Sequence, residues 1–428
     1  MPADLNVIHA AQLARILDRG GPRRGRLQGE LDLVADGAVA IRGGQIVAAG
    51  PTRQVLEAAG ADVPTLDASG LCVLPGLVDC HSHPLYAGHE GGNGPAREYV
   101  RRLEGAKSWD IRAEGGGIWA VIEATRNASD QALLDSAARA YADILAGGVT
   151  TLEVKSGFGY TCEQELRQLR LLRESAARTP MDLVYTYVGA EFHPRDGTSL
   201  EACVQNILDR ILPAVRAQGI AEFHDMCCED GDYSAPLIVR LLEASRRLGM
   251  PTRVHADANS HSKGWRTAVE GGAVTADHLT YTPDEEIRAL AGCDTVAVVM
   301  PLAEQIFLDQ RRANARLFIE CSVPLAVSTD FNANIHATSL PLTIALACTW
   351  FRLTPAEAIV GATLNAAYAL RRGGDRGSLD VGKRGDLAIL DCSHPDEIAL
   401  AMGAPLVRCV IAQGQVVHRS GPGAPPAA

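Results

Sequence analysis

Residues 74–83 read LPGLVDCHSH, a short apolar run that ends in two histidines separated by one residue. Such a run is typical of a parallel strand that is buried on both faces. Side chains at positions i and i+2 of a strand point to the same face, so His81 and His83 can converge on one metal ion. This pair alone is a weak signal, and its weight depends on what the other strands carry.

Seven further segments have the same texture, being short and apolar with polar residues at the carboxyl end. They read TTLEVKS, LVYTYVGAE, EFHDMCCE, PTRVHAD, AVTADHL, TVAVVMP and PLAVSTD. Helical patterns separate them, for example over residues 162–178 and 234–249, where apolar residues recur at three- and four-residue spacing. Eight such repeats predict an α/β fold with a (β/α)8 TIM barrel, whose functional site lies at the carboxyl ends of its strands.

The two ends of the chain consist of short alternating runs broken by glycine, as in VADGAVAIRGGQIVAAG and LVRCVIAQGQVVHRSG. Such runs are typical of strands joined by tight turns. We therefore expect residues 1–74 and 374–420 to form a small β-sandwich domain, residues 75–373 to form the barrel and residues 421–428 to form a flexible tail. The connection over residues 83–148 is too long for one helix and has room for a lid over the barrel mouth.

The 428 residues include 40 Lys and Arg against 51 Asp and Glu, a net charge of −11. This charge repels phosphate backbones and anionic lipids, so neither nucleic acid nor a membrane is expected as a partner. The chain has no apolar run near the roughly 20 residues that cross a bilayer, and its start does not resemble a secretory signal. We predict a cytoplasmic protein that acts on a small molecule, with its eleven cysteines reduced.

Three more strand ends carry residues that bind metals. His255 lies in VHAD, His278 lies in ADHL, and Asp330 ends the eighth strand within STDFN. Ordinary core or surface histidines would not all fall at the carboxyl ends of predicted barrel strands. The pattern therefore predicts a metal site at this end of the barrel.

This arrangement resembles the amidohydrolase superfamily, with HxH on strand one, histidines on strands five and six and aspartate on strand eight. Within that superfamily the chain is similar to the imidazolonepropionases over nearly its whole length. The ordered matches are LPGLVDCHSH, RRLEGAKSWDIRAEGGGI, EATRNAS, GVTTLEVKSGFG, LPAV, VHAD, ADHL, STDFN and SLDVGKRGDLAILD. These matches are specific for fold and metal chemistry and less specific for the substrate.

The resemblance implies one Zn²⁺ per subunit, with iron as the alternative, and a homodimer. The implied ligands are His81, His83, His255 and Asp330. Water on such a metal becomes a nucleophile at neutral pH. Asp330 would take its proton and pass it to the leaving nitrogen, while His278 would donate a hydrogen bond to the developing oxyanion or orient the water.

A site with two metals is less expected. The two-metal branches of the superfamily need a bridging ligand, usually a carboxylated lysine on strand four. Here strand four reads EFHDMCCE, while Lys155 lies on strand two. Glu229 is the remaining candidate for a bridge, although a polar residue that simply closes its strand is the more ordinary interpretation.

The positions that bind the substrate in imidazolonepropionases differ in this chain. By simple counting, Glu90 replaces an arginine, Phe158 replaces the tyrosine of SGYG, Glu191 replaces the histidine of GAH, and Ala258 replaces a Glu or Gln. A glutamate in place of an arginine turns a clamp for a carboxylate into a repulsive group. We therefore expect a substrate other than imidazolonepropionate, cationic or rich in N–H donors.

The register near Glu90 is uncertain because of inserted glycines, so Arg97, Arg195 or Lys263 remain alternative clamps for an anionic tail. Trp109 and Phe158 would form flat walls for a heterocycle, or else belong to the core. The candidate substrate-binding residues are Glu191, Phe158, Glu90, Trp109, Arg97 and His193.

The sequence thus predicts a metal-dependent amidohydrolase that opens a cyclic amide or amidine C–N bond in a small imidazolone-like heterocycle. The alternative is an aminohydrolase that releases ammonia from an amino-substituted azaheterocycle. Because residue 258 is alanine, that alternative needs another proton donor, and Glu191 is the candidate. A catalytically inactive binding protein is a third reading, which the presence of all four ligand types disfavours.

Overall fold

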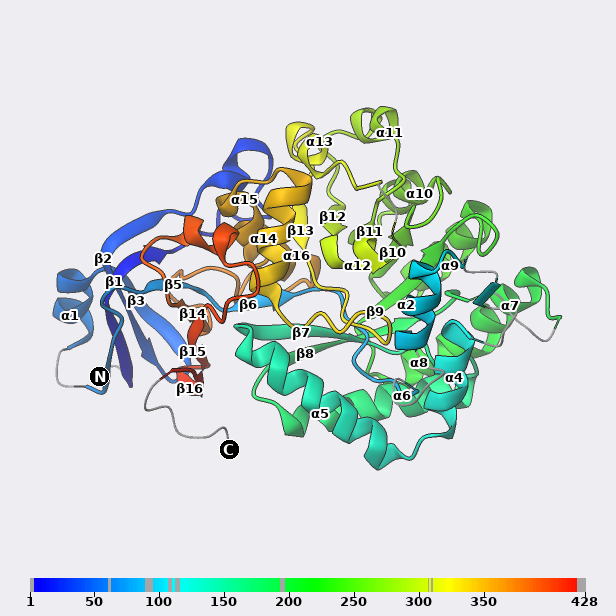
Figure 1. The fold of residues 1–428 in the computed structure, drawn as a ribbon, viewed down its shortest axis with the longest axis horizontal. Helices are drawn as coiled ribbons and strands as arrows, with labels where there is room; N and C mark the ends of the chain where they lie inside the picture. Colours follow the sequence, from blue (N-terminus) through cyan, green and yellow to red (C-terminus); the bar gives the residue numbers. More distant parts are fainter. Residues whose placement is uncertain are drawn as a thin grey trace.

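The chain forms a barrel of parallel strands with a mixed sheet at one side (Figure 1). The computed structural model describes residues 4–60, 63–88, 95–106, 110–111, 116–192, 197–306, 308 and 311–421. None of the helices in this described part of the chain is long and apolar enough to cross a membrane.

The barrel contains the eight strands expected from the sequence, and every neighbouring pair along the sheet runs parallel. In order around the sheet they are β6 (Leu77–Asp79), β7 (Val149–Lys155), β8 (Asp182–Val188), β9 (Phe223–Cys228), β10 (Thr252–Ala256), β11 (Thr275–His278), β12 (Val296–Val299) and β13 (Leu325–Val327). Nearly all of their side chains are buried, as the continuous apolar runs predict. The predicted α/β barrel fold is confirmed.

Helices follow the strands, and most of them cover the outside of the barrel. They are α4 (Ile118–Asn127), α5 (Asp130–Ala146), α6 (Cys162–Ser175), α7 (Leu200–Asn206), α8 (Leu212–Gln218), α9 (Ala235–Arg247), α10 (Gly264–Glu270), α11 (Asp284–Ala289), α12 (Pro301–Ile306), α13 (Ala315–Glu320), α14 (Leu340–Phe351), α15 (Pro355–Gly361) and α16 (Leu364–Ala369). Their starts follow local chemistry. For example, the Thr161 hydroxyl caps α6 and the Ser129 hydroxyl caps α5.

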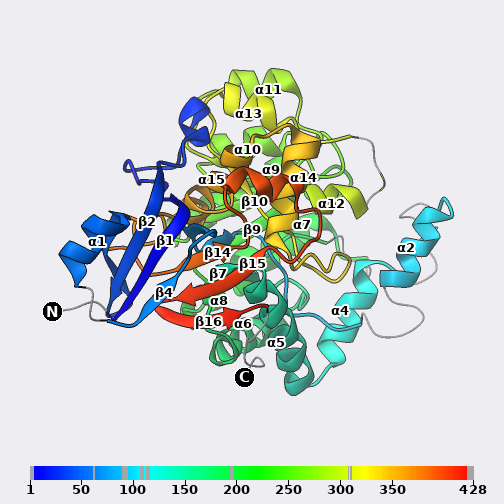
Figure 2. The same cartoon turned by 60° about the vertical axis from the view of Figure 1, so that its left-hand side comes forward.

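The connection between β6 and β7 holds α2 (Pro95–Leu103), α4 and α5. Helices α2 and α4 stand out from the barrel at the right of Figure 2. Residues of both helices, among them Glu98, Arg102 and Trp119, line the cavity above the carboxyl ends of the strands. Glu98 also fixes the start of α4 by accepting a hydrogen bond of 2.6 Å from the backbone N–H of Gly117. The long connection therefore contributes part of the wall of the barrel mouth.

Strands from both ends of the chain form the second sheet. These are β1 (Leu5–Ala14), β2 (Leu33–Arg42), β3 (Gln45–Pro51), β4 (Thr65–Asp67), β5 (Cys72–Pro75), β14 (Leu387–Leu390), β15 (Val407–Ala412) and β16 (Gln415–Arg419). The antiparallel pair β5 and β14 joins the two ends, and α1 (Thr52–Ala59) packs against β2 and β3. Strand β1, which the sequence analysis did not identify, pairs with β2, β4 and β5.

The barrel closes between its first and last strands through side chains more than through a ladder. Ser82 and Phe331 form an isolated parallel bridge, and the His83 N–H donates to the Phe331 carbonyl at 2.7 Å. The buried carboxylate of Asp79 spans the same gap. It accepts hydrogen bonds from the Ser328 hydroxyl, from the Thr329 N–H at 3.1 Å and from the Thr329 hydroxyl at 2.6 Å. Asp79 thus ties the first strand to the segment that carries Asp330.

We expect Asp79→Asn to lower the free energy of unfolding by about 2–4 kcal/mol, because three donors in a buried seam lose their charged acceptor. Urea unfolding in the presence of a chelator measures this effect without a contribution from bound metal. Asp67→Asn is the matched control, since Asp67 is exposed and accepts hydrogen bonds from Ser69 alone. An Asp79→Asn protein as stable as this control would show that the seam does not depend on the carboxylate.

Candidate metal centre

Three histidines from two strands meet at the carboxyl end of the barrel. His81 and His83 follow β6, and His255 lies in β10. All three are buried, and one ring nitrogen from each lies within 4.8 Å of those of the other two. Imidazole nitrogens at this spacing can bind a single metal ion. The protein therefore contains the three-histidine metal site that the sequence predicts.

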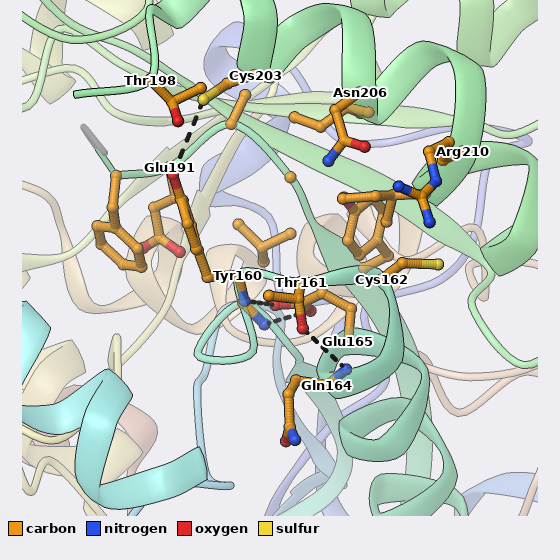
Figure 3. Close-up of a pocket in the computed structure, with 18 of the residues that line it drawn as sticks. Tyr160, Thr161, Cys162, Gln164, Glu165, Glu191, Thr198, Cys203, Asn206 and Arg210 are labelled. Carbon is orange, nitrogen blue, oxygen red and sulfur yellow. Dashed lines mark hydrogen bonds between the residues drawn. The ribbon is translucent and has the colours of Figure 1, made fainter. Parts of the chain in front are cut away.

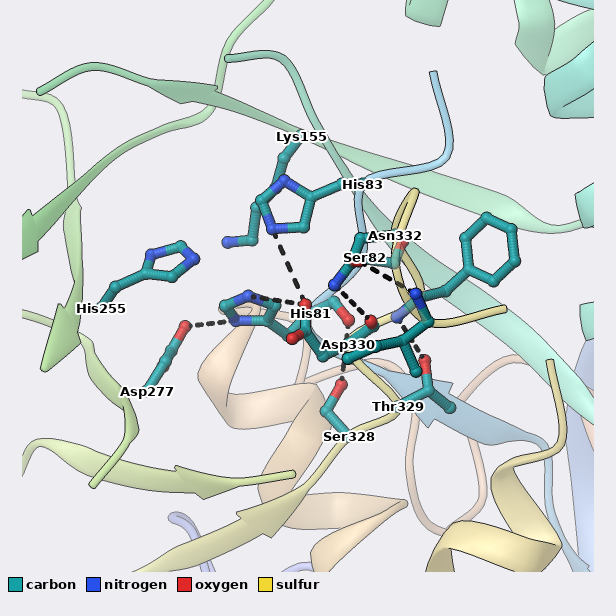
Figure 4. A network of polar contacts seen from close by, with 12 residues as sticks. His81, Ser82, His83, Lys155, His255, Asp277, Ser328, Thr329, Asp330 and Asn332 are labelled. Atoms are coloured by element: carbon teal, nitrogen blue, oxygen red, sulfur yellow. Dashed lines mark hydrogen bonds and ion pairs between the residues drawn. The ribbon is translucent and has the colours of Figure 1, made fainter. Parts of the chain in front are cut away.

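Asp330 lies beside these histidines in the segment after β13 (Figure 4). One oxygen of its carboxylate is 3.6 Å from Nε2 of His81 and 3.9 Å from Nε2 of His83. His278 is also close, with its ring centroid 5.4 Å from that of His81 and 5.2 Å from that of His255. The structure thus brings together all five residues that the sequence analysis selected for metal binding and proton transfer.

Backbone conformation is strained at two of these residues. The φ angles of His278 and Asp330 are 80° and 53°, in the left-handed region that residues other than glycine seldom adopt. Such conformations persist only where the surrounding structure enforces them, and they gather at functional sites. Here they turn the two side chains at the ends of β11 and β13 toward the histidines.

Buried carboxylates orient two of the metal-binding rings. Nδ1 of His81 is 2.8 Å from a carboxylate oxygen of Asp277, and Nδ1 of His255 is 3.1 Å from one of Asp225. An imidazole that donates from Nδ1 presents an unprotonated Nε2 to a metal. Nε2 of His81 is buried and has no hydrogen-bond partner among the described residues. An orphaned acceptor of this kind is costly unless a cation uses it, so the residues fit a bound metal ion.

Two buried cations balance these carboxylates. Nζ of Lys155 lies 2.5 Å from Asp225 and 2.9 Å from Glu153, and the Arg253 guanidinium lies 3.0 Å from Asp277 and 3.1 Å from Glu153. All five side chains are fully buried. They form a layer of ion pairs inside the barrel, directly below the histidines.

Burial dominates the electrostatics of the site. It lowers the pKa of His81 and of His278 well below the usual value, which favours neutral imidazoles. Burial raises the pKa of Asp330 to about 7. His255 differs: burial lowers its pKa, but the Asp225 carboxylate outweighs this and raises it to about 9. A metal ion bound to His255 would displace that proton.

A cavity of about 880 Å³ opens over the centre and is lined by His83, His255, His278 and Asp330. Phe158 and Glu191 form part of its wall, as the sequence analysis proposed. Burial raises the pKa of Glu191 to about 8, and Oε2 of its carboxyl group has no hydrogen-bond partner within the described chain. This side chain is therefore available to a ligand.

Glu229, considered above as a bridge between two metals, holds a loop instead. Its carboxylate accepts hydrogen bonds from the backbone N–H groups of Ala258 and Asn259 and from the Ser260 hydroxyl. The residue lines the cavity at the end of β9. Its polar groups fix the loop after β10, which confirms the ordinary interpretation of a residue that closes its strand.

The remaining substrate-binding candidates either do not line the cavity or lie outside the described residues. The side chain of Arg97 is exposed on α2, and the cavity lining includes its neighbours Glu98 and Arg102 but not Arg97. Lys263 is exposed before α10. Glu90, Trp109, His193 and Arg195 lie outside the described residues.

Comparison with known proteins agrees with this geometry. The family described as "Amidohydrolase family" matches residues 72–417. The chain belongs to this family. It is also 38% identical to the imidazolonepropionase of Symbiobacterium thermophilum over 425 residues, 98% of each chain. It is 37% identical to that of Geobacillus kaustophilus over 397 residues, 92% of each chain. The amidohydrolase is thus an enzyme that hydrolyses carbon–nitrogen bonds.

Two solved structures share the fold of this amidohydrolase. A zinc-bound adenosine deaminase from Xanthomonas campestris superposes with a TM-score of 0.69 at 19% identity, covering 97% of this chain and 93% of that one. A mutant of the atrazine chlorohydrolase TrzN from Arthrobacter aurescens, complexed with zinc and atraton, gives 0.71 at 17% identity, covering 97% and 95%. At such identities the similarity concerns the fold alone.

The sequence analysis did not find the ion-pair layer. A usable signal was present, because charged residues at positions i and i+2 occur inside otherwise apolar strands, at Glu153 and Lys155 in β7 and at Arg253 and His255 in β10. Buried strands tolerate such charges only when partners face them. Spacing alone does not reveal which partners meet across the barrel.

We expect Asp277→Asn to weaken zinc binding by about 10- to 100-fold, because the His81 ring loses the carboxylate that orients it. Competition with a chromophoric chelator measures the dissociation constant. Ser245→Ala is the matched control, since the Ser245 hydroxyl lies 2.6 Å from Nδ1 of His224, a buried histidine of β9 that does not line the cavity. Equal zinc affinity in Asp277→Asn and Ser245→Ala would rule out this orienting role.

Proposed function

We propose that this amidohydrolase is a zinc enzyme that opens a cyclic amide or amidine C–N bond in a small imidazolone-like heterocycle, and that imidazolonepropionate is not its substrate. The observation that carries this proposal is the grouping of His81, His83, His255 and Asp330 below one cavity. The 38% identity with an imidazolonepropionase over 98% of both chains supports the cyclic amide as the bond that is cleaved.

One zinc ion per subunit would be held by the three histidines and by Asp330, whose carboxylate oxygen faces His81 and His83. Iron is the alternative metal, because imidazole and carboxylate ligands suit both ions. A metal ion in this site supplies Lewis-acid activation of water and of the carbonyl group.

Asp330 is proposed to move the proton. Its carboxylate lies beside the metal-binding histidines, where it can accept a proton from the attacking water and give it to the leaving nitrogen. His278 is neutral in this environment and lies against the same histidines. We assign to it a hydrogen bond to the carbonyl oxygen as negative charge develops there.

Glu191 and Phe158 are proposed to select the substrate. The Phe158 ring offers a flat apolar wall, and the carboxyl group of Glu191 offers an acceptor for N–H groups. Glu98, Glu229, Asp230 and Asp232 line the same cavity, against Arg102 as the single basic side chain other than histidine among its lining residues. An acidic wall of this kind disfavours a carboxylate tail and favours a cationic ring or one rich in N–H donors.

An aminohydrolase is the second candidate, and Glu191 favours it. Its pKa is raised to about 8, so the carboxyl group is largely protonated at neutral pH and can donate a proton to a ring nitrogen. That reaction releases ammonia and leaves the ring intact, whereas ring opening adds water without loss of ammonia.

We propose a homodimer, as the resemblance to imidazolonepropionases implies. We also propose a cytoplasmic location, which the free cysteines favour.

Removal of the metal is expected to abolish turnover, and added Zn²⁺ is expected to restore it, since hydrolysis at neutral pH needs an activated water. A panel of five-membered cyclic amides and amidines, with and without an amino substituent, provides the substrates, and mass spectrometry identifies the products. A gain of one water supports ring opening, and ammonia with an intact ring supports the aminohydrolase. Full activity of metal-free protein would contradict both.

Glu191→Gln separates binding from proton transfer. If Glu191 only binds N–H groups of the substrate, we expect KM to rise about 10-fold with kcat nearly unchanged, because a carboxamide is a weaker acceptor. If it delivers a proton, kcat falls instead. Glu163→Gln is the control, since Glu163 is exposed at the start of α6 and does not line the metal cavity. Unchanged kinetics in Glu191→Gln would remove Glu191 from the site.

A further inference from the structure

A second cavity, of about 570 Å³, is lined by residues of β8, α6 and α7 (Figure 3). Alternate side chains of β8 face opposite ways. The Thr186 hydroxyl donates to Glu153 in the barrel interior, whereas Tyr187 lines this second cavity. The cavity lies between α6 and the segment formed by α7 and the π-helical turn η3 (Ile207–Ile211).

Tyr187 presents a polar group to this space. Its side chain is only 1% exposed, yet its hydroxyl makes no hydrogen bond within the described chain. The ring stacks on that of His224 at a centroid distance of 5.0 Å, which fixes its direction. A Cβ atom at Gly189 would approach the hydroxyl to 2.7 Å, so glycine there leaves the hydroxyl its room. Tyr187 lines the cavity, and its hydroxyl is open to it, so a ligand there can supply the missing hydrogen-bond partner.

One side chain with an amide and one with a guanidinium group face the second cavity from the wall opposite Tyr187. Asn206 and Arg210 lie four residues apart, and Figure 3 shows both directed toward the cavity. Both residues are exposed, and neither side chain has a hydrogen bond or an ion pair in the part of the chain that is described, so both are free to contact a ligand. Arg210 lies in the π-helical turn, a distortion that is frequent at functional sites. Together the two groups offer several N–H donors to one carboxylate.

The charges and walls of the cavity limit its occupant. Arg126 and Arg210 are its two basic side chains, and Glu163, Glu165 and Glu191 are its three acidic ones. The carboxylate of Glu165 is already engaged by backbone N–H groups, including those of Gly159 and Tyr160 at 2.8 Å. Tyr160, Tyr187 and Tyr233 contribute aromatic surface. An aromatic body that carries one carboxylate for the Arg210 guanidinium matches this lining.

We propose that this cavity is a binding site for a small aromatic or heteroaromatic carboxylate, with its carboxylate on Arg210 and Asn206 and its ring beside Tyr187. Glu191 and Phe192 line both this cavity and the metal cavity. The ligand would therefore lie next to Glu191, a residue that also forms part of the wall of the metal cavity. The proposal concerns binding alone and does not depend on which bond the enzyme hydrolyses.

Isothermal titration calorimetry on the zinc-loaded full chain tests this site. The probes are benzoate, phenylacetate and indole-3-acetate, each paired with its neutral carboxamide. We expect at least one carboxylate to bind once per chain and at least about tenfold more tightly than its carboxamide, because the guanidinium makes charge-assisted hydrogen bonds. Arg210→Ala should weaken that carboxylate at least about tenfold, and Tyr187→Phe should weaken it several-fold while preserving the ring.

Arg246→Ala is the matched control, since Arg246 is exposed at the end of α9 and lines neither cavity. It should bind the carboxylate as the unmodified protein does. Arg210 and Tyr187 do not line the metal cavity, so their effects identify the second cavity as the site. If none of the carboxylates binds at millimolar concentration, or if Arg210→Ala binds as tightly as Arg246→Ala, the proposal is overturned.

Discussion

The structure depends on the closure of the barrel between its first and last strands. Asp79 on β6 and the segment after β13 are about 250 residues apart in the chain, and the Asp79 carboxylate joins them through Ser328 and Thr329. This seam lies directly below the metal centre. It holds His81 and His83, which follow the first strand, next to Asp330, which follows the last strand. The same contacts that close the barrel therefore also set the geometry of the metal ligands.

Below the ligands, the barrel interior holds charge where most barrels hold apolar side chains. Lys155 and Arg253 face Asp225, Asp277 and Glu153 with no exposure to solvent. A buried ion pair seldom adds stability compared with apolar packing, because desolvation costs about as much as the attraction returns. The arrangement instead holds the carboxylates of Asp225 and Asp277 in place, which is what the rings of His81 and His255 require for metal binding.

The sequence predicted most of what local pattern determines. All eight barrel strands and the five residues at their ends were found. A short apolar run predicts a buried strand, and a His or Asp at its end predicts a metal-binding residue. Strand β1 was missed because its alanines weaken the β pattern and a bulge near His9, with φ of 59°, breaks the alternation. The partners of Lys155 were missed because they depend on which strands face one another. The substrate remains the least readable part, since the positions that differ from imidazolonepropionases, such as Glu191, act through the shape and charge of a cavity.

Glu191 follows β8 and, together with Phe192, lines both the metal cavity and the second cavity. A replacement here alters the surroundings of two separate molecules at once. A substitution that improves binding in one cavity therefore also changes binding in the other. The specificities of the two cavities cannot evolve independently at this position. A substitution at such a position would change the substrate of a barrel enzyme and the ligand of its second cavity together.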